Sequence, residues 1–298
     1  MVLLNLRSCT LCPRRCGSNR ESGKGFCGEG SKIRIARAAL HFGEEPCISG
    51  TKGSGTVFFS GCALRCRFCQ NAKISHEGFG AEVEEERLGR IFLELQEQGA
   101  HNLNLVTPSH FAPQIAAALK TVRNQLKIPI VFNGSGYESP EILQEFNGLV
   151  DIYLTDLKYF DSTKSMRYSA AEDYFAVASQ AIQEMFRQVG PCRFSRDGLL
   201  QRGLLIRHLI LPGCKEDSIN LIRWVANHFS PEEIRISLMR QYAPCGDLSD
   251  CPEINRTLFT MEYDAVLREA RKLDFLGYGQ GRGCDNFDFT PSFDLTGL

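Results

Sequence analysis

The sequence predicts an α/β protein in which strand–helix units build a parallel sheet with helices on its outside. Three observations predict this class. From Thr56 onward, short apolar runs rich in β-branched residues alternate with longer amphipathic stretches. The runs have the length and composition of strands, and the longer stretches have the length of helices. A regular alternation of the two is typical of parallel strands joined by helical crossovers.

Six such units follow one another along the chain. The expected strands are residues 56–61, 102–107, 128–133, 150–156, 204–211 and 233–239. The expected helices are residues 84–98, 111–126, 140–146, 172–189, 218–229 and 254–273. Ser139 and Pro140 pair a capping serine with proline at the first helical position, which predicts where the third helix starts. Six units are fewer than the eight of a closed barrel, so a partial barrel and an open doubly wound sheet both fit.

Three further segments flank these units. Residues 1–30 are rich in cysteine, arginine and glycine, and residues 31–55 form a connector. The strand–helix units occupy residues 56–276. Residues 277–298 are expected to form an irregular C-terminal tail.

Composition narrows the function classes. The chain has 298 residues and a net charge of -1, with no long basic run, so binding driven by nucleic-acid phosphates is not expected. Neither a signal peptide nor an apolar stretch long enough to cross a membrane is evident, so we expect a cytoplasmic protein without a membrane partner. The 13 cysteines are odd in number and clustered, which favours metal ligands in a reducing compartment over disulfides.

The tightest cysteine cluster follows the first predicted strand. In GCALRCRFCQ, residues 61–70, Cys62, Cys66 and Cys69 have the spacing C-x3-C-x2-C. Thiolates are the usual ligands of iron–sulfur clusters, and three of them on a four-iron cube leave one iron open. An open position is where a substrate or cofactor binds. The alternatives are three buried free thiols, or a zinc site completed by a remote histidine.

This loop, with Phe68 before its last cysteine, resembles the radical SAM superfamily. The resemblance implies a partial (β/α)6 TIM-type barrel with a small N-terminal Cys-rich metal-binding segment. It also implies a [4Fe–4S] cluster whose open iron binds S-adenosylmethionine (SAM). Reductive cleavage of SAM would then yield a 5′-deoxyadenosyl radical that abstracts hydrogen, and Phe68 would lie against the adenine.

Other segments extend the resemblance to a narrower family. CTLCPRRCGSNRESGKGFCGEG, NLVTPSH, NGSGYES, DIYLTDLKY, GLLIRHLILPG and SLMRQYAP together resemble the uncharacterised homologues of pyruvate formate-lyase activating enzyme, the PflX-type proteins. This implies a glycyl-radical protein or peptide as substrate. We also expect a flavodoxin- or ferredoxin-type electron donor. One alternative is radical SAM modification of another peptide, a nucleic acid or a small molecule. An alternative of another class is an iron–sulfur redox module without SAM turnover.

Polar residues at the ends of the second and third strands are candidate SAM ligands. Activating enzymes have Gly-Gly-Glu after the second strand, where this chain has Thr107, Pro108 and Ser109, followed by His110. Thr107 and Ser109 offer oxygen acceptors, or they form only a strand-to-helix turn with Ser109 as its cap. At the third strand, Asn133 and Ser135 are candidates for the SAM carboxylate or ribose, with simple turn chemistry as the alternative.

The fourth to sixth strands supply the remaining candidates. Asp156 and Lys158 are two apart, so an extended strand points them the same way. Their Asp-Leu-Lys matches a motif of the activating enzymes, which implies a place near SAM and substrate; a structural ion pair is the alternative. His208 is a further catalytic candidate or a hydrogen-bonded core residue, with Arg207 on the opposite face. Gln241, followed by Tyr242, falls where activating enzymes place a histidine near the substrate.

The N-terminal cysteines form a second candidate metal site. Cys9, Cys12, Cys16 and Cys27 are a complete four-thiolate set, either for a structural zinc or for a second [4Fe–4S] cluster. The arginines around them at 14, 15 and 20 give local positive charge that favours an acidic electron donor, or merely a solvated face. The other cysteines show no ligand spacing: Cys47, Cys192, Cys214, Cys245, Cys251 and Cys284.

Overall fold

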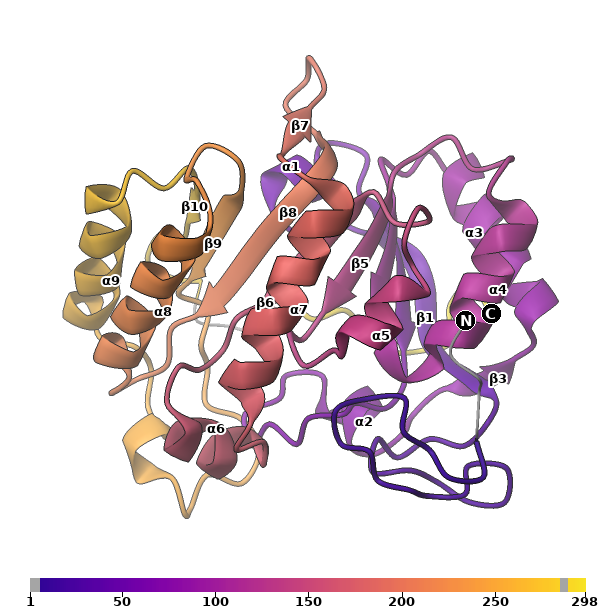
Figure 1. The fold of residues 1–298 in the computed structure, drawn as a ribbon, viewed down its shortest axis with the longest axis horizontal. Helices are drawn as coiled ribbons and strands as arrows, with labels where there is room; N and C mark the ends of the chain where they lie inside the picture. The colour runs from indigo at the N-terminus through magenta and orange to yellow at the C-terminus, as the bar shows by residue number, and fades with distance from the viewer. Residues whose placement is uncertain (1–5, 285–288) are drawn as a thin grey trace.

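The body of the protein is one mixed sheet with helices packed along its outer face (Figure 1). The computed structural model describes residues 6–284 and 289–298. The parallel strands are β2 (Ser54–Phe59), β4 (Leu103–Val106), β5 (Ile130–Gly134), β6 (Ile152–Asp156), β8 (Leu200–Leu209) and β9 (Arg235–Met239). Each of the first five pairs with the next of the six along the chain. The six predicted strands and the partial (β/α)6 barrel are therefore confirmed.

Shorter strands extend this parallel core. β1 (Ile33–His41) pairs antiparallel with β2, and β3 (Ala81–Val83) pairs antiparallel with β1. At the other end β10 (Gly277–Gly279) runs parallel to β9, while β7 (Arg193–Phe194) pairs with β8. Within residues 6–284 and 289–298, β3 and β10 stand at opposite ends of the strand order, so the barrel is open.

The structure differs from the sequence prediction in the two segments that flank this core. The predicted connector, residues 31–55, contains β1, whose arginines at positions 34 and 37 hide the apolar pattern of a half-covered strand. The predicted irregular tail contains β10, whose two glycines have low strand propensity. In both segments, pairing with a neighbouring strand made the backbone extended where the local sequence did not predict a strand.

The helices cover the outer face. The six predicted ones appear as α3 (Glu85–Glu97), α4 (Ala112–Val122), α5 (Pro140–Gln144), α7 (Tyr174–Val189), α8 (Lys215–His228) and α9 (Thr260–Lys272). Ser139 caps α5 as predicted, accepting a hydrogen bond from the Ile142 amide. The short helices are α1 (Pro46–Ser49), α2 (Ala72–Ser75) and α6 (Ser162–Ser169), with 3₁₀ turns η1 (Ser109–Phe111) and η2 (Pro252–Ile254). No helix among the described residues is long and apolar enough to span a membrane.

The inner face of the sheet changes from apolar to polar along the strands. Val131, Leu154 and Leu205 form an apolar layer that α1 closes with Ile48. Side chains two positions further along a strand point to the same face. The next layer is therefore polar and lies nearer the carboxyl ends of the strands, with Asn133, Asp156 and Arg207. The N-terminal segment, indigo in Figure 1, lies beyond the same ends beside α2.

Candidate functional site

The three-cysteine loop leaves β2 at its carboxyl end and bends into the open barrel. Cys62, Cys66 and Cys69 line one cavity of about 130 Å³. Gly61, directly before the loop, has φ +83°, and a Cβ there would lie 2.5 Å from the Glu29 side chain. Only glycine therefore permits the sharp turn that brings the loop over the strand ends.

Each sulfur of this loop has a hydrogen-bond partner. The Leu64 amide donates to Cys62 Sγ at 3.4 Å, and Ser169 Oγ donates to Cys66 Sγ at 3.0 Å. Cys69 Sγ lies 3.2 Å from Ser75 Oγ. Hydrogen bonds to sulfur are among the protein's means of tuning a bound cluster, so the donor set suits thiolate ligands.

The three thiols are chemically suited to a cluster. Burial raises the pKa of Cys66 to about 11 although Lys158 opposes the shift, so the free thiol is neutral and metal binding would release its proton. Among the described residues, no three His, Cys, Asp or Glu side chains are placed to share one metal ion. A four-iron cube takes each thiolate on a different iron, so its ligands need not meet at one point.

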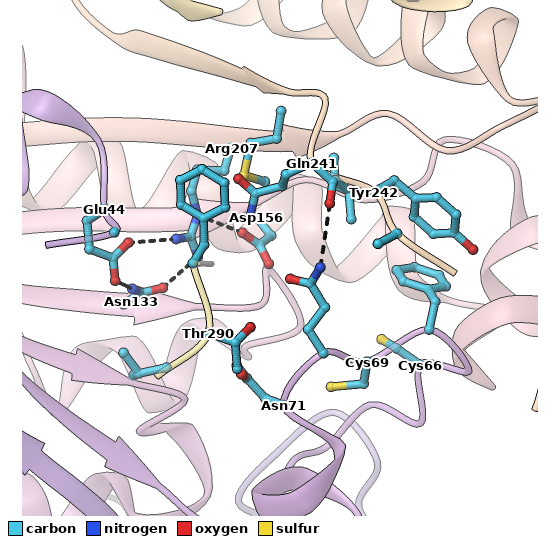
Figure 2. A pocket seen from close by; sticks show the side chains of 18 of the residues that line it. Glu44, Cys66, Cys69, Asn71, Asn133, Asp156, Arg207, Gln241, Tyr242 and Thr290 are labelled. Atoms are coloured by element: carbon cyan, nitrogen blue, oxygen red, sulfur yellow. Dashed lines mark hydrogen bonds and ion pairs between the residues drawn. The ribbon is translucent and has the colours of Figure 1, made fainter. Parts of the chain in front are cut away.

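A chain of buried charges leads from the barrel interior toward the cysteines (Figure 2). Glu44 Oε2 accepts from Arg207 Nη1 at 3.1 Å, and Arg207 Nε donates to Asp156 Oδ1 at 2.9 Å. Lys158 Nζ then donates to Asp156 Oδ2 at 2.6 Å. Asn133 Oδ1 accepts from Arg207 Nη2 at 2.6 Å, and Asn133 Nδ2 donates to Glu44 Oε1 at 3.1 Å. Carboxylates and cations therefore alternate along the chain.

Electrostatic interactions keep Asp156 and Lys158, within this series of buried charges, ionised. Burial alone would raise the pKa of Asp156, but Arg207 and Lys158 outweigh it and the pKa is lowered. Burial alone would lower the pKa of Lys158, but Asp156 outweighs it and the pKa is raised. For Glu44, burial raises the pKa and Arg207 opposes the shift only in part. Asp156 and Lys158 thus form the ion pair that was the alternative to a site role, and they also line the cavity.

A second cavity, of about 210 Å³, adjoins the first. The two share eight lining residues, among them Cys66, Asn133 and Lys158. Phe68 and Gln241 line the second cavity, and Phe68 packs edge-on against Tyr242 with ring centroids 5.5 Å apart. The structure thus brings these predicted residues to one place.

Thr107 and Ser135 join the group on the cysteine side. Both line the smaller cavity, and Thr107 adopts φ +57° where its strand ends. Ser109 lies outside either cavity lining and donates to Glu138 Oε1 at 2.9 Å. Glu138 Oε1 also accepts from the Ser135 amide at 3.1 Å, so Ser109 supports the β5 turn indirectly.

His208 departs most from its prediction. Its Nδ1 contacts the Leu157 carbonyl oxygen at 2.6 Å and its Nε2 contacts Ser218 Oγ at 2.8 Å, so both ring nitrogens are occupied. It lines neither cavity, and burial lowers its pKa to about 4. His208 points to the helix side of β8, and the same alternation turns Arg207 inward. The catalytic expectation for His208 is corrected accordingly.

Two residues of the site were missed from the sequence. Arg207 could have been predicted from the sequence, because a charge inside an apolar strand is costly to bury unless it is paired. Glu44 could not, because it lies in the bend between β1 and α1, far from any predicted strand end. It reaches the site only because β1 folds back beside β2.

The four N-terminal cysteines lie in one looped segment. Burial is the main cause that raises the pKa of Cys12 to about 11, and Cys27, Cys9 and Cys16 each add to it. The Gly17 amide donates to the Cys9 carbonyl oxygen at 3.0 Å and closes the loop. Cys16 is exposed, whereas the other three are buried.

This segment packs directly on the three-cysteine loop. The Cys62 amide donates to the Cys27 carbonyl oxygen at 3.1 Å. Arg14 Nε donates to the Ala63 carbonyl oxygen at 2.8 Å. Arg20 is 1% exposed and donates to the His110 carbonyl oxygen at 2.8 Å.

Two of the three nearby arginines are therefore structural anchors. Arg14 and Arg20 bind backbone carbonyl groups of the loop and of η1. Arg15 is the one of the three that is exposed. The expected positive surface for an electron donor is correspondingly smaller than the sequence suggested.

Part of the chain matches a known protein family. Residues 56–190 match the Radical SAM superfamily. An uncharacterised protein of Methanocaldococcus jannaschii is 29% identical over 280 residues, which cover 89% of this chain and 75% of the relative.

Two solved structures align with this chain at low sequence identity. SuiB of Streptococcus suis, bound to its precursor peptide SuiA, is 15% identical with a TM-score of 0.46 over 75% of this chain. The chain spans less than half of SuiB, 47%. Methylornithine synthase (PylB) is 12% identical with a TM-score of 0.47, over 86% of this chain and 77% of its own.

Proposed function

Because residues 56–190 match the Radical SAM superfamily, we propose that the protein binds a [4Fe–4S] cluster on Cys62, Cys66 and Cys69 and cleaves SAM beside it. One observation carries the proposal: all three cysteines line the cavity that also holds Asp156 and Lys158. When bound, the cluster supplies the electron that splits SAM into methionine and a 5′-deoxyadenosyl radical, which takes a hydrogen atom from the substrate.

In this proposal, the buried charges that run from Glu44 to Lys158 orient SAM. Lys158 uses one N–H for Asp156, which leaves two donors for the carboxylate of SAM. Arg207 holds Asp156 from the other side and keeps its charge in place. Asp156 therefore acts as a positioning residue for Lys158, because it fixes the ammonium group rather than exchanging a proton.

Neutral residues complete the pocket. Phe68 offers an aromatic face to the adenine, as the sequence resemblance implies. Thr107 and Ser135 offer oxygen acceptors on the cysteine side, and Asn133 offers its amide at the junction of the two cavities. Gln241 lies across the larger cavity, on the side expected for substrate.

A second metal at Cys9, Cys12, Cys16 and Cys27 is part of the proposal. Four cysteines saturate either a [4Fe–4S] cluster or a zinc ion. The contact between Cys27 and Cys62 favours a cluster, because a redox centre there would lie next to the first one. The exposed Cys16 marks the side from which a flavodoxin- or ferredoxin-type donor would approach.

For the substrate, we propose a polypeptide, with a glycyl radical on a partner protein as the specific form. Asp156-Leu157-Lys158, which resembles the motif of glycyl-radical activating enzymes, supports this form. Both residues of the pair line the larger cavity. Modification of another peptide, a nucleic acid or a small molecule is the competing outcome.

Product analysis tests the reaction. Anaerobically reconstituted protein, given dithionite and SAM, should release 5′-deoxyadenosine and methionine in equal amounts. Cys66→Ala should abolish release, whereas Cys284→Ala, at a thiol that lines neither cavity, should not change it. If the cluster-loaded wild-type protein releases no 5′-deoxyadenosine, the enzyme proposal fails and a redox module without SAM turnover takes its place.

A further inference from the structure

The segment of residues 289–298 is called the strap here. It begins over the larger cavity and then runs along β1. The Leu295 amide donates to the Ala36 carbonyl oxygen at 3.0 Å, and the Ala38 amide donates to the Thr296 carbonyl oxygen at 2.8 Å. β3 pairs with β1 only as far as Ile35, so this edge of β1 is open from Ala36 onward. The strap thus satisfies a strand edge that the sheet leaves unpaired.

One side chain of the strap has a built socket. Phe293 is 6% exposed and packs with Phe58, Ile74 and Val106. Its ring meets that of Phe58 edge to face, with centroids 5.5 Å apart. Lys73 Nζ donates to the Phe293 carbonyl oxygen at 2.7 Å and fixes the backbone at this position.

The residues before Phe293 reach the candidate active site. Phe289, Thr290 and Pro291 line the larger cavity together with Glu44, Asp156 and Lys158. Figure 2 shows Thr290 among these residues, close to Asn71 in the view. A stretch of polypeptide therefore already leads from the β1 edge into the place where we expect radical chemistry.

Beyond the Phe293 socket, Leu298 packs against the main core and Arg87 Nη2 donates to the Gly297 carbonyl oxygen at 3.3 Å. Arg37 Nη1 bonds Asp294 Oδ1 at 2.7 Å, but the Asp294 side chain is 49% exposed, so solvent screens the pair. Leu295 adopts φ +65°, which a leucine rarely does. Ser292 and residues 294–297 are exposed, so the buried contacts of the strap that oppose its exchange for another chain are concentrated at its Phe293 and Leu298 positions.

We propose that the strap occupies the entry path of an extended polypeptide segment, which pairs with the β1 edge and places an aromatic side chain in the Phe293 socket. The residue three positions before that aromatic group then lies over the cavity, as Thr290 does. Backbone pairing gives such a groove its affinity, and a side-chain socket gives it selectivity. The inference rests on the proposed function only for what happens to the peptide after it is bound.

Gly297 is the position to substitute when the proposal is tested in the full chain. It has φ +83°, and a Cβ there would lie 2.0 Å from the Ala38 carbonyl oxygen. Gly297→Val should therefore displace the strap and expose the Ala38 amide to hydrogen exchange. Gly281→Ala is the matched control, because a Cβ at Gly281 meets nothing within 4 Å.

The probe is a fluorescein-labelled peptide with the sequence of residues 289–298, followed by fluorescence anisotropy without cluster or SAM. Gly297→Val protein should bind it saturably, and wild-type and Gly281→Ala proteins at least tenfold more weakly. A peptide carrying Phe293→Ala should lose at least tenfold in affinity. If Gly297→Val misfolds, full-chain Phe293→Ala, which empties the socket, should bind the wild-type peptide in its place.

Three outcomes would overturn the proposal. The Ala38 amide could stay protected in Gly297→Val, which would make the strap a fixed part of the fold. The displaced protein could fail to bind the peptide. Wild-type protein could bind it as tightly as the variant. None of these would alter the release of 5′-deoxyadenosine, so failure here is distinguishable from failure of the proposed function.

Discussion

Replacing Arg207 by methionine should expose how the buried charge chain is balanced. Arg207 bonds Asp156, Glu44 and Asn133 at 2.9, 3.1 and 2.6 Å. Asp156 keeps Lys158 as a partner, but Glu44 loses its cation and keeps only amide donors from Asn104 and Asn133. Breaking a buried pair in this way costs about 3–5 kcal/mol.

The loss of stability in Arg207→Met should depend on pH, and the direction of this dependence follows from the pKa of Glu44. Burial already raises the pKa of Glu44, and Arg207 opposes that shift, so Arg207→Met raises the pKa further. In the pH range between the unfolded and the folded pKa, the folded variant then binds more protons than the unfolded chain. Stability therefore falls as pH rises through this range, by up to about 1.4 kcal/mol for each pH unit.

Urea unfolding at pH 5.5 and pH 7.5, on proteins matched in metal content, measures this effect. Arg207→Met should be closer to wild type at pH 5.5, and adding Glu44→Gln should recover about 2 kcal/mol at pH 7.5, because no unpaired buried charge remains. The control Arg223→Met removes a pair with Glu269 in which the Arg223 side chain is 58% exposed, and should change stability by less than about 0.5 kcal/mol. A deficit that grows at low pH, or no recovery with Glu44→Gln, would refute the reasoning.

Three other predictions test the rest of the site. Lys158→Met should weaken SAM binding at least tenfold in equilibrium dialysis of cluster-loaded protein, and unchanged affinity would remove Lys158 from the SAM site. The triple variant with alanine at Cys62, Cys66 and Cys69 should retain iron at the N-terminal cysteines; zinc without iron in elemental analysis would reject the second cluster. Burial lowers the pKa of His208 to about 4, so the neutral ring contributes stability that is lost as pH falls from about 6.5 toward 4. His208→Gln should weaken that slope in thermal unfolding and leave 5′-deoxyadenosine release unchanged, whereas loss of release from folded protein would restore His208 to the site.

Local spacing made the sequence informative about the core of the site. Cys62, Cys66 and Cys69 sit on one loop, so their approach needs no distant contact. Asp156 and Lys158 point the same way because the side chains of a strand alternate with a period of two. The six strand–helix units could be predicted for the same reason, since each depends on periodicity within a short window.

Tertiary structure decided what local pattern leaves open. A strand buried on both faces reads as continuously apolar, so the sequence did not say whether Arg207 or His208 faces the barrel. Glu44 and Arg207 are 163 positions apart and meet only because β1 folds back on the sheet. The strap could not be predicted either, because its partner on β1 lies more than 250 positions earlier.

The N-terminal cysteines fall between these cases. Their number and spacing predicted a four-thiolate set from the sequence alone. That Cys27 bonds the backbone of Cys62, and that Arg14 and Arg20 are anchors and not a charged surface, followed only from the fold. Short spacings determine which side chains can share a site, whereas long-range packing determines what that site faces.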